Sequence, residues 1–416
     1  MLFSAGLGVG LDKDELIAMA GTVGFEPPFD IKGNRITVEG KNFRYTDRKI
    51  RSIRSNPLTA LPYDQIPRSV GGLTPIGTYF DGTVRPGTVF GTGPSGYRAN
   101  TTGDYGTLNA FVLVDSNDQP RFPPRDGTEG TPDSLTANEV RTIIRNALTI
   151  AFRARAQIRR PLGSHAQVTV SVVDTNGSIL GIARTPDGPV FGTDVSLQKA
   201  RTAAFFSNTN TAADLIRANL GNYWLAAKAV LGPGALSDGT AFADRSGGNL
   251  SRPFFPDGID GAPHGPFSKP FSEWSPFNVG LQLDLIAANI VAHRSFLLGQ
   301  SSTDTPMNCT PIPVRPQTSK SPVANGIQIF PGSVPIYRNN TLIGGIGVSG
   351  DGIDQDDMIS FLGLHNAGLE LGTGVGNAPR LIRADNLEVP GGRLRYVNCP
   401  FLPFLDSNEQ TPCNGK

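Results

Sequence analysis

The sequence predicts an α+β fold, because two β-hairpin patterns occur among amphipathic helical patterns along the chain. The first hairpin pattern, at 168–185, contains Asn-Gly at 176–177, a pair that strongly favours tight hairpin turns. The second, at 334–348, turns at 338–340, where asparagine tolerates the positive φ that such turns require. Apolar residues at helical spacing over 140–154 predict a helix ahead of the first hairpin.

Length and charge limit the function classes. At 416 residues the chain is long enough for about two domains with a sizeable core. A net charge of +1 gives the whole molecule no electrostatic basis for binding nucleic acid or an anionic membrane. The 50 glycines and 34 prolines predict long irregular connections. We expect no membrane span, because no apolar run reaches the length of about 18–20 residues that one needs.

The predicted helices have recognisable starts. Thr136 and Glu139 form a capping-box pattern ahead of the 140–154 helix. Thr193-Asp194 is predicted to cap the next helix, over 196–206. Two further helices are expected over 211–230 and 281–298.

Arginines occupy the face of the 140–154 helix opposite its apolar residues. These arginines could form a nucleic-acid-binding patch. A solvated helix face is favoured, because the molecule as a whole is nearly neutral. The residues are Arg141, Arg145, Arg153 and Arg155.

Two blocks of the sequence occur twice and in the same order. Residues 11–17 align without gaps with 353–359, and 31–47 align without gaps with 382–398. Repeated blocks in fixed order indicate repeated structural units. Glycines at 6–10 would then be the remnant of a glycine turn.

The repeat predicts a domain organisation with an incomplete first unit. An incomplete unit leaves a strand edge uncovered, so we expect the complete domain or another chain to cover it. The predicted parts are the C-terminal half of an incomplete repeat at 1–47, a Gly/Pro-rich arm and linker at 48–133, a complete domain at 134–398 with an irregular insert at about 232–318, and a polar tail at 399–416.

A glycine motif follows the second hairpin pattern. Gly345, Gly347 and Gly350 match G-x-G-x-x-G, but a dinucleotide loop needs a parallel strand that leads directly into a helix. A hairpin precedes the motif here, so these glycines are expected to serve close packing and a turn. Aspartates follow, and without calcium-loop spacing they suit a helix N-terminus better than a calcium site. They are Asp351, Asp354, Asp356 and Asp357.

Three ordered blocks resemble the GlcG/HbpS-like family, a haem-binding domain also found at the C-terminus of PduO. The blocks are V-V-D-x-x-G ending at Gly177, K-A-R-T-A at 199–203, and a hairpin and turn from Pro335 to Gly350. The resemblance covers about 134–365, interrupted by the insert, and 1–20 is similar to the tail of a second copy. It implies an antiparallel β-sheet with flanking helices, assembly into oligomers, and haem or corrinoid binding.

The resemblance also marks candidate ligand residues. Asp174, Lys199, Arg201 and Thr202 are the polar positions of the pattern, and they would line a cleft for a small anion or a haem propionate. The alternative is structural: Asp174 starts the turn, while Lys199 and Arg201 cap carbonyl groups or form a salt bridge.

His293 is the candidate axial ligand if haem is bound. It shares a helix face with Leu283, Ile286 and Ile290, which allows a pocket-facing imidazole. The alternative is a half-buried, hydrogen-bonded histidine. Covalent haem attachment is excluded, because the sequence contains no C-x-x-C-H.

The three cysteines leave the redox setting open. Cys399 and Cys413 bracket the tail and are placed to close a disulfide loop, which leaves Cys309 unpaired. Free cytosolic thiols are the alternative. No signal peptide is visible at the N-terminus, but a disulfide and the secreted, embellished branch of the family favour an extracytoplasmic setting.

Two functions follow. The first is a small-ligand-binding protein of the GlcG/HbpS-like type, with haem as the candidate cofactor, acting in a homo-oligomer or with a partner chain that completes the N-terminal half-domain. The second is a structural or assembly subunit whose arm and half-domain link neighbouring chains. The sequence contains no nucleophile–base pair, zinc motif or phosphate loop that would specify an enzyme.

Overall fold

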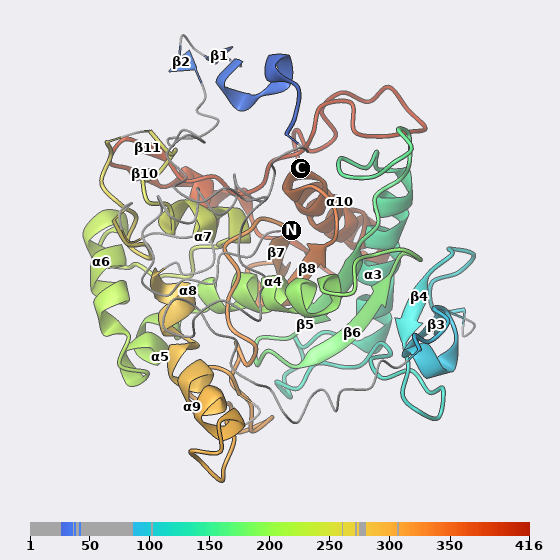
Figure 1. The fold of residues 1–416 in the computed structure, drawn as a ribbon, viewed down its shortest axis with the longest axis horizontal. Coiled ribbons are helices and arrows are strands. Elements are labelled where there is room, and N and C mark those ends of the chain that lie inside the picture. The colour runs from blue at the N-terminus through green and yellow to red at the C-terminus, as the bar shows by residue number, and fades with distance from the viewer. Residues whose placement is uncertain are drawn as a thin grey trace, which may run out of the picture.

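The centre of the molecule is a seven-stranded antiparallel sheet in the order β3-β4-β6-β5-β8-β7-β9 (Figure 1). The computed structural model describes residues 26–35, 37–38, 41–42, 86–100, 103–259, 261–270, 273, 280–305 and 308–416. The strands of the sheet are β3 (Tyr97–Ala99), β4 (Phe111–Leu113), β5 (Thr169–Val173), β6 (Ile179–Arg184), β7 (Ser333–Arg338), β8 (Thr341–Ser349) and β9 (Val375–Asn377). The predicted α+β class with an antiparallel sheet and flanking helices is confirmed.

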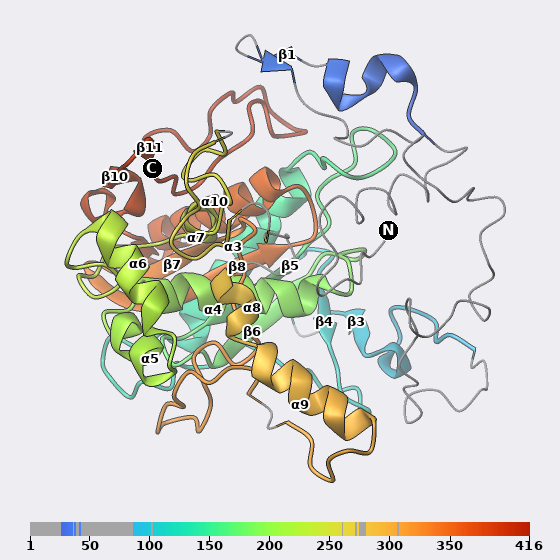
Figure 2. The same cartoon turned by 60° about the vertical axis from the view of Figure 1, so that its left-hand side comes forward.

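Helices cover both faces of the sheet. Helices α3 and α10 pack together on one face and α4 covers the other (Figures 1 and 2). Of the remaining helices, α5 and α6 follow α4 in the chain, and α7, α8 and α9 lie in the insert. The bounds are α3 (Ala137–Arg153), α4 (Gly192–Phe206), α5 (Thr211–Arg217), α6 (Gly221–Leu231), α7 (Asp244–Leu250), α8 (Gly280–Asp284), α9 (Ala287–Leu297) and α10 (Ile353–Leu371).

The side chains of β5 alternate between the two faces of the sheet. Val170 and Val172 are fully buried in the main core beneath α3 and α10. Ser171 points to the opposite face, where its Oγ lies 2.8 Å from Oγ of Ser196 on α4. Successive side chains of a strand alternate between faces, so one short segment supplies both the apolar core and the polar contact to α4.

Both predicted hairpin turns form. Gly177 has a φ of +75° and donates its N–H to the Asp174 carbonyl at 3.0 Å, which closes the β5–β6 turn. In the β7–β8 turn Asn339 has a φ of +52°, a conformation that asparagine tolerates better than most residues.

The glycines of β8 allow α4 to approach the sheet closely. A Cβ at Gly347 would lie 2.0 Å from the Ser196 carbonyl oxygen, and one at Gly345 would lie 2.2 Å from that of Ala200. The expected packing role of this motif is therefore confirmed.

The capping box at the start of α3 is confirmed. The Glu139 N–H donates to Thr136 Oγ1, while the Glu139 carboxylate accepts from the Thr136 N–H. The arginine face of α3 lies at the surface in ion pairs: Arg141 with Asp104 at 3.0 Å, and Arg153 with Asp406 at 2.7 Å.

Three details of the predicted helices are wrong. Helix α4 begins at Gly192 with Phe191 in the N-cap position, so the side chains of Thr193 and Asp194 do not cap it. The predicted 211–230 helix is divided into α5 and α6, because Asn219 adopts a φ of +60° ahead of Gly221.

The predicted 281–298 helix is also divided, into α8 and α9. Leu281 and Leu285 are buried in the core of the insert, whereas α9 continues along the surface with Ile290 and Val291 exposed. The change in direction lets the two leucines stay in the core.

The N-terminal residues repeat the local structure of 380–393. Each element lies where the gapless alignment of 31–47 with 382–398 puts it. Two 3₁₀ turns, η1 (Phe29–Ile31) and η2 (Gly33–Arg35), precede the hairpin of β1 (Thr37–Val38) and β2 (Lys41–Asn42), as η8 (Arg380–Ile382) and η9 (Ala384–Asn386) precede that of β10 (Glu388–Val389) and β11 (Gly392–Arg393). The glycines at 6–10 and the block at 11–17 lie outside the described residues.

The described part of the predicted arm adds to the sheet. Strands β3 and β4 lie within 48–133 and extend the sheet beyond β6. Residues 48–85 lie outside the described residues. Among the helices that the structure describes, none combines the length and the apolar character needed to cross a bilayer.

Candidate functional site

Asp174 stabilises the β5–β6 turn. Its Oδ2 accepts the Thr128 N–H at 2.8 Å and its Oδ1 accepts the Ser178 N–H at 2.8 Å. Burial raises the pKa of this carboxyl, and the hydrogen bonds from Thr128 oppose the increase. With both oxygens engaged and the residue fully buried, Asp174 occupies the turn-forming role that the sequence left as its alternative.

Lys199 is buried in an ionic network between α4 and α10. Its Nζ donates to Asp356 Oδ2 and to the Val348 carbonyl, both at 2.9 Å. Burial raises the pKa of Asp356 to about 6, against the Lys199 cation. Asp244 of the insert is completely buried nearby, and burial raises its pKa well above the ordinary value despite Lys199. This network joins the insert to the main domain.

Arg201 and Thr202 of α4 contact the segment that follows the insert. Arg201 donates to the Gly177 carbonyl at 2.9 Å and to Asn325 Oδ1 at 2.7 Å. Burial lowers the pKa of Arg201 to about 10, so the side chain remains a cation at neutral pH. Thr202 donates to the Gln198 carbonyl at 2.7 Å. Lys199 and Arg201 therefore point to different neighbours and do not form one anion cleft with Asp174.

His293 lies on α9 at the surface. Its Nδ1 lies 2.7 Å from Asp304 Oδ1, and about 38% of each side chain is exposed. The expected pocket-facing imidazole is wrong, because α9 follows the surface instead of burying the face that carries Ile290. Figures 1 and 2 show α9 at the edge of the molecule, away from the C-terminal segment.

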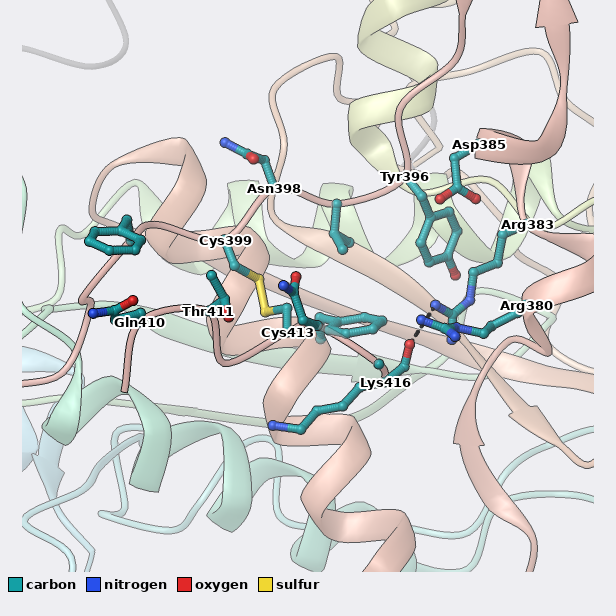
Figure 3. A pocket seen from close by; sticks show the side chains of 15 residues that line it. Arg380, Arg383, Asp385, Tyr396, Asn398, Cys399, Gln410, Thr411, Cys413 and Lys416 are labelled. Atoms are coloured by element: carbon teal, nitrogen blue, oxygen red, sulfur yellow. Dashed lines mark hydrogen bonds between the residues drawn. A yellow bond between two sulfur atoms is a disulfide. The ribbon is translucent and has the colours of Figure 1, made fainter. Parts of the chain in front are cut away.

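A cavity lies between α10 and the C-terminal segment. We call it the C-terminal pocket, with a volume of about 410 Å³ (Figure 3). Its lining residues are Phe361, Arg380, Arg383, Asp385, Tyr396, Val397, Asn398, Cys399, Phe401, Gln410, Thr411, Cys413, Asn414, Gly415 and Lys416.

Arg383 is the central cation of this pocket. It is only 9% exposed, and its guanidinium carbon lies 5.3 Å from the ring centres of both Phe361 and Tyr396. It donates to the Ala378 carbonyl at 2.9 Å and to the main-chain oxygen of Lys416 at 3.0 Å. Within the described residues no Asp or Glu side chain forms an ion pair with it. Burial lowers its pKa, and Tyr396 and Asp385 oppose the decrease.

A second cation and two aromatic residues complete the pocket. Arg380 lies beside Arg383 (Figure 3), and its charge also acts to lower the Arg383 pKa. Phe401 is 63% exposed at the opening, whereas the Tyr396 hydroxyl is buried without a hydrogen-bond partner among the described residues. The pocket thus places two arginines beside aromatic side chains, which suits an anion attached to a ring.

The disulfide forms part of the pocket wall. Cys399 and Cys413 are joined, as the sequence allowed, and Cys309 remains a free, exposed thiol. The bond holds the segment with Gln410 and Thr411 against the extended segment that carries Tyr396 and Asn398 (Figure 3).

The pocket is connected to the buried ionic network. The Asn398 N–H donates to Asp357 Oδ2 at 2.9 Å, and Arg245 Nε donates to the same oxygen at 2.5 Å. Burial raises the pKa of Asp357 to about 6, against the Arg245 cation.

Sequence reasoning missed this pocket. Its walls come from α10, from η8 and the turn after it, and from the tail that the disulfide folds back. The block at 382–398 contains Arg383 and Tyr396, but the sequence marked it only as part of a repeat.

The family comparison bears on this domain. A family model described as "Haem degrading protein HbpS-like" matches residues 287–364, which include α9, β7, β8 and most of α10. The predicted HbpS-like resemblance is confirmed. The matched HbpS-like segment supplies one wall of the C-terminal pocket through Phe361.

Two solved structures are similar to the chain at low identity. The crystal structure of a PduOC:heme complex shares 17% identity, covers 59% of this chain and 99% of that chain, and has a TM-score of 0.27. The crystal structure of Klebsiella pneumoniae protein ORFY, of family DUF336, shares 16% identity, covers 58% and 94%, and has a TM-score of 0.28. The comparison with curated proteins gives no match.

Haem fits the C-terminal pocket only in part. The arginines match its carboxylates, and the aromatic side chains suit its ring. For iron, the lining residues offer the Tyr396 hydroxyl, since Cys399 and Cys413 are bonded to each other. Burial raises the Tyr396 pKa, which keeps the phenol protonated and makes it a poor iron ligand. The pocket therefore does not fit iron ligation.

Proposed function

We propose that this HbpS-like protein binds a small ring compound that carries carboxylates, with haem and other porphyrins as the candidate class, in the C-terminal pocket. The observation that carries the proposal is Arg383, a buried cation with no acidic side chain paired to it in the described part of the chain, at the floor of a cavity of about 410 Å³. A buried charge is costly unless it is compensated, and a bound carboxylate would add to the compensation that the main-chain oxygens of Ala378 and Lys416 give.

Binding would depend on the carboxylates and the ring, because the pocket does not supply a strong iron ligand. Arg383 would hold one carboxylate, and the exposed Arg380 would meet a second one at the opening. The match to a family described as haem degrading supports the porphyrin class.

A porphyrin titration tests this function. Protoporphyrin IX should quench the tryptophan fluorescence of the protein, whereas its dimethyl ester should bind at least about tenfold more weakly, because the ester removes both charged hydrogen bonds. Arg380→Gln should weaken the free acid by about tenfold and leave the ester unchanged.

Arg393→Gln is the matched control, because Arg393 is an exposed arginine outside the pocket. Equal affinity for acid and ester would end the carboxylate proposal. Hemin and metal-free protoporphyrin should bind alike, so a strong preference for hemin would show that iron ligation had been wrongly excluded.

Assembly through the N-terminal segment is the second candidate function. The elements at 29–42 have the same order and the same hairpin register as those at 380–393. Ile382 packs against the main core, whereas Ile31, its aligned counterpart, is 68% exposed. These observations support a role for 1–47 in completing another HbpS-like unit, either with a partner chain or within a homo-oligomer.

Light scattering after size exclusion tests the assembly. Ile31→Asp should reduce the mass of the assembled species, and Leu162→Asp, at a position that is 82% exposed, should leave it unchanged. A monomeric wild-type protein without partners would contradict the proposal.

We also propose an extracytoplasmic setting, which the Cys399–Cys413 disulfide supports. Thiol labelling of protein taken directly from cells should modify Cys309 alone. Labelling of all three cysteines would contradict this setting.

A further inference from the structure

A second cavity lies between α4, α8 and the segment that follows the insert. It has a volume of about 230 Å³ and is lined by Gln198, Gln282, Ile286, Gly326, Ile327, Gln328 and Phe330. We call it the glutamine pocket. It shares no lining residue with the C-terminal pocket.

The chemistry of the glutamine pocket differs from that of the C-terminal pocket. Its polar groups are three carboxamides, and the described lining residues include no charged side chain. Ile286 and Ile327 form apolar walls, and Phe330 is 42% exposed at the rim. A neutral ligand suits such a lining, because nothing there compensates a charge.

Hydrogen bonds fix the orientation of the three amides. Gln328 Nε2 donates to Gln198 Oε1 at 2.9 Å, and Gln282 Nε2 donates to the Ile327 carbonyl at 3.3 Å. Rotating the Gln282 amide would place its oxygen against that carbonyl oxygen, so the observed orientation is the favourable one. Gln282 Oε1 is then left buried with no partner in the described part of the chain.

A ligand that binds in this pocket should donate a hydrogen bond to the unpaired Gln282 Oε1. The second N–H groups of the carboxamides remain to donate beside it, so a complementary ligand carries a donor next to an acceptor. We infer that the glutamine pocket binds a small, neutral, planar molecule of the amide type, a carboxamide or lactam, whose N–H donates to Gln282 Oε1 while its ring contacts Phe330.

Arg201 and Thr202 are positioning residues for this pocket. Thr202 Oγ1 accepts the Gln328 N–H at 2.9 Å and donates to the Gln198 carbonyl, so it ties two walls together. Arg201 holds Asn325, whose carbonyl accepts from Gln198 Nε2. Two of the residues marked by sequence resemblance therefore support a cavity that they do not line.

Titration calorimetry with nicotinamide and nicotinate tests the inference, because the two differ chiefly in an amide against a carboxylate. Nicotinamide should bind in the range of roughly 0.1–10 mM expected for a fragment of its size. Nicotinate should bind the glutamine pocket at least about tenfold more weakly, because it lacks the N–H donor. Gln282→Leu should weaken nicotinamide by about tenfold as well.

Two further variants keep the result interpretable. Gln300→Leu, at an exposed position outside the pocket, should leave nicotinamide binding unchanged. Phe330→Ala changes only the rim and should also weaken nicotinamide binding. This variant still tests the inference if Gln282→Leu disturbs the fold. Absence of nicotinamide binding at 25 °C, or equal affinity in wild type, Gln282→Leu and Phe330→Ala, would overturn the inference. Porphyrin binding at the C-terminal pocket should be unaffected by either variant.

Discussion

Glu139 is a single carboxylate that joins the start of α3 to the β7–β8 hairpin. Besides capping α3, it accepts hydrogen bonds from Arg338 Nη1 and Nη2 at 2.8 and 2.9 Å, and from Thr373 Oγ1 at 2.8 Å. Burial acts to raise its pKa, but the bonds from Arg338, Thr136 and Thr373 outweigh burial and lower it from 4.5 to about 2.

Glu139→Gln should reduce the free energy of unfolding by roughly 1–3 kcal/mol at pH 7. A lowered carboxyl pKa gives stability that is present above pH 4.5 and lost as the pH falls towards 2, so wild type and variant should converge in acid. Urea unfolding at several pH values measures this. Glu370→Gln, which removes a half-exposed partner of Arg145, should cost less than about 0.5 kcal/mol. A constant difference across pH would contradict the assignment.

Lys199 and Asp356 should show the cost of separating a buried pair. Lys199→Met leaves a buried carboxylate uncompensated and should destabilise the protein by about 3–5 kcal/mol, whereas Lys199→Met with Asp356→Asn should recover much of that loss. Losses that simply add in the double variant would contradict the pairing.

The raised pKa of Asp356 gives that position the opposite pH dependence to Glu139. Its folded-state value of about 6 exceeds its ordinary value of 3.8, so the folded state holds this proton more tightly. The stability of wild type relative to Asp356→Asn should therefore fall as the pH rises from 4 to above 6. Urea unfolding over that range measures the difference, and a difference that grows with pH would contradict the raised value.

At the scale of elements, the close contact between α4 and β8 requires glycine at position 347. Gly347→Ala would place a methyl group 2.0 Å from the Ser196 carbonyl oxygen, so α4 must move away from the sheet. We expect a loss of about 3 kcal/mol or more in thermal unfolding. Gly376→Ala on β9 is the matched control, because its Cβ would meet open space, and its effect should stay within about 1 kcal/mol. Similar losses for both glycines would show that strand propensity, not the contact with α4, decides the effect.

Local patterns predicted the elements better than their contacts. The turns at Gly177 and Asn339 and the cap at Thr136 formed as expected, because their signals are contained within a few residues. The break at Asn219 was missed, since helical spacing continues across it. A salt bridge of Lys199 was one of the alternatives, but its partner could not be identified, because Asp356 lies on a distant helix.

The candidate site was less predictable for the same reason. Arg383 becomes a pocket residue only when the disulfide folds the tail back towards α10, and His293 was selected from a helix that the structure divides. Sequence spacing reports what lies along one element. It does not report which surface that element finally contacts.

At the scale of the whole molecule, the disulfide links pocket and tail. Replacing Cys399 and Cys413 by serine should lower the unfolding free energy by about 2–3 kcal/mol, as expected for a loop of this length. Protoporphyrin affinity should fall as well, because Gln410 and Thr411 are no longer held at the pocket. Cys309→Ser should change neither property. If the double-serine variant kept its porphyrin affinity, the tail would not contribute to ligand binding.

The strand order also has a consequence for synthesis. β5 pairs with β6 on one side, but on the other side Thr169 pairs with Ser349, beyond the whole insert. On the ribosome the β5–β6 hairpin therefore emerges with one edge bare, and that edge stays bare until β8 has been translated. Pairing between such distant residues is slow, and an apolar strand edge that waits for its partner can join the wrong one. The insert thus lengthens the interval during which the β5 edge of a nascent chain is unpaired.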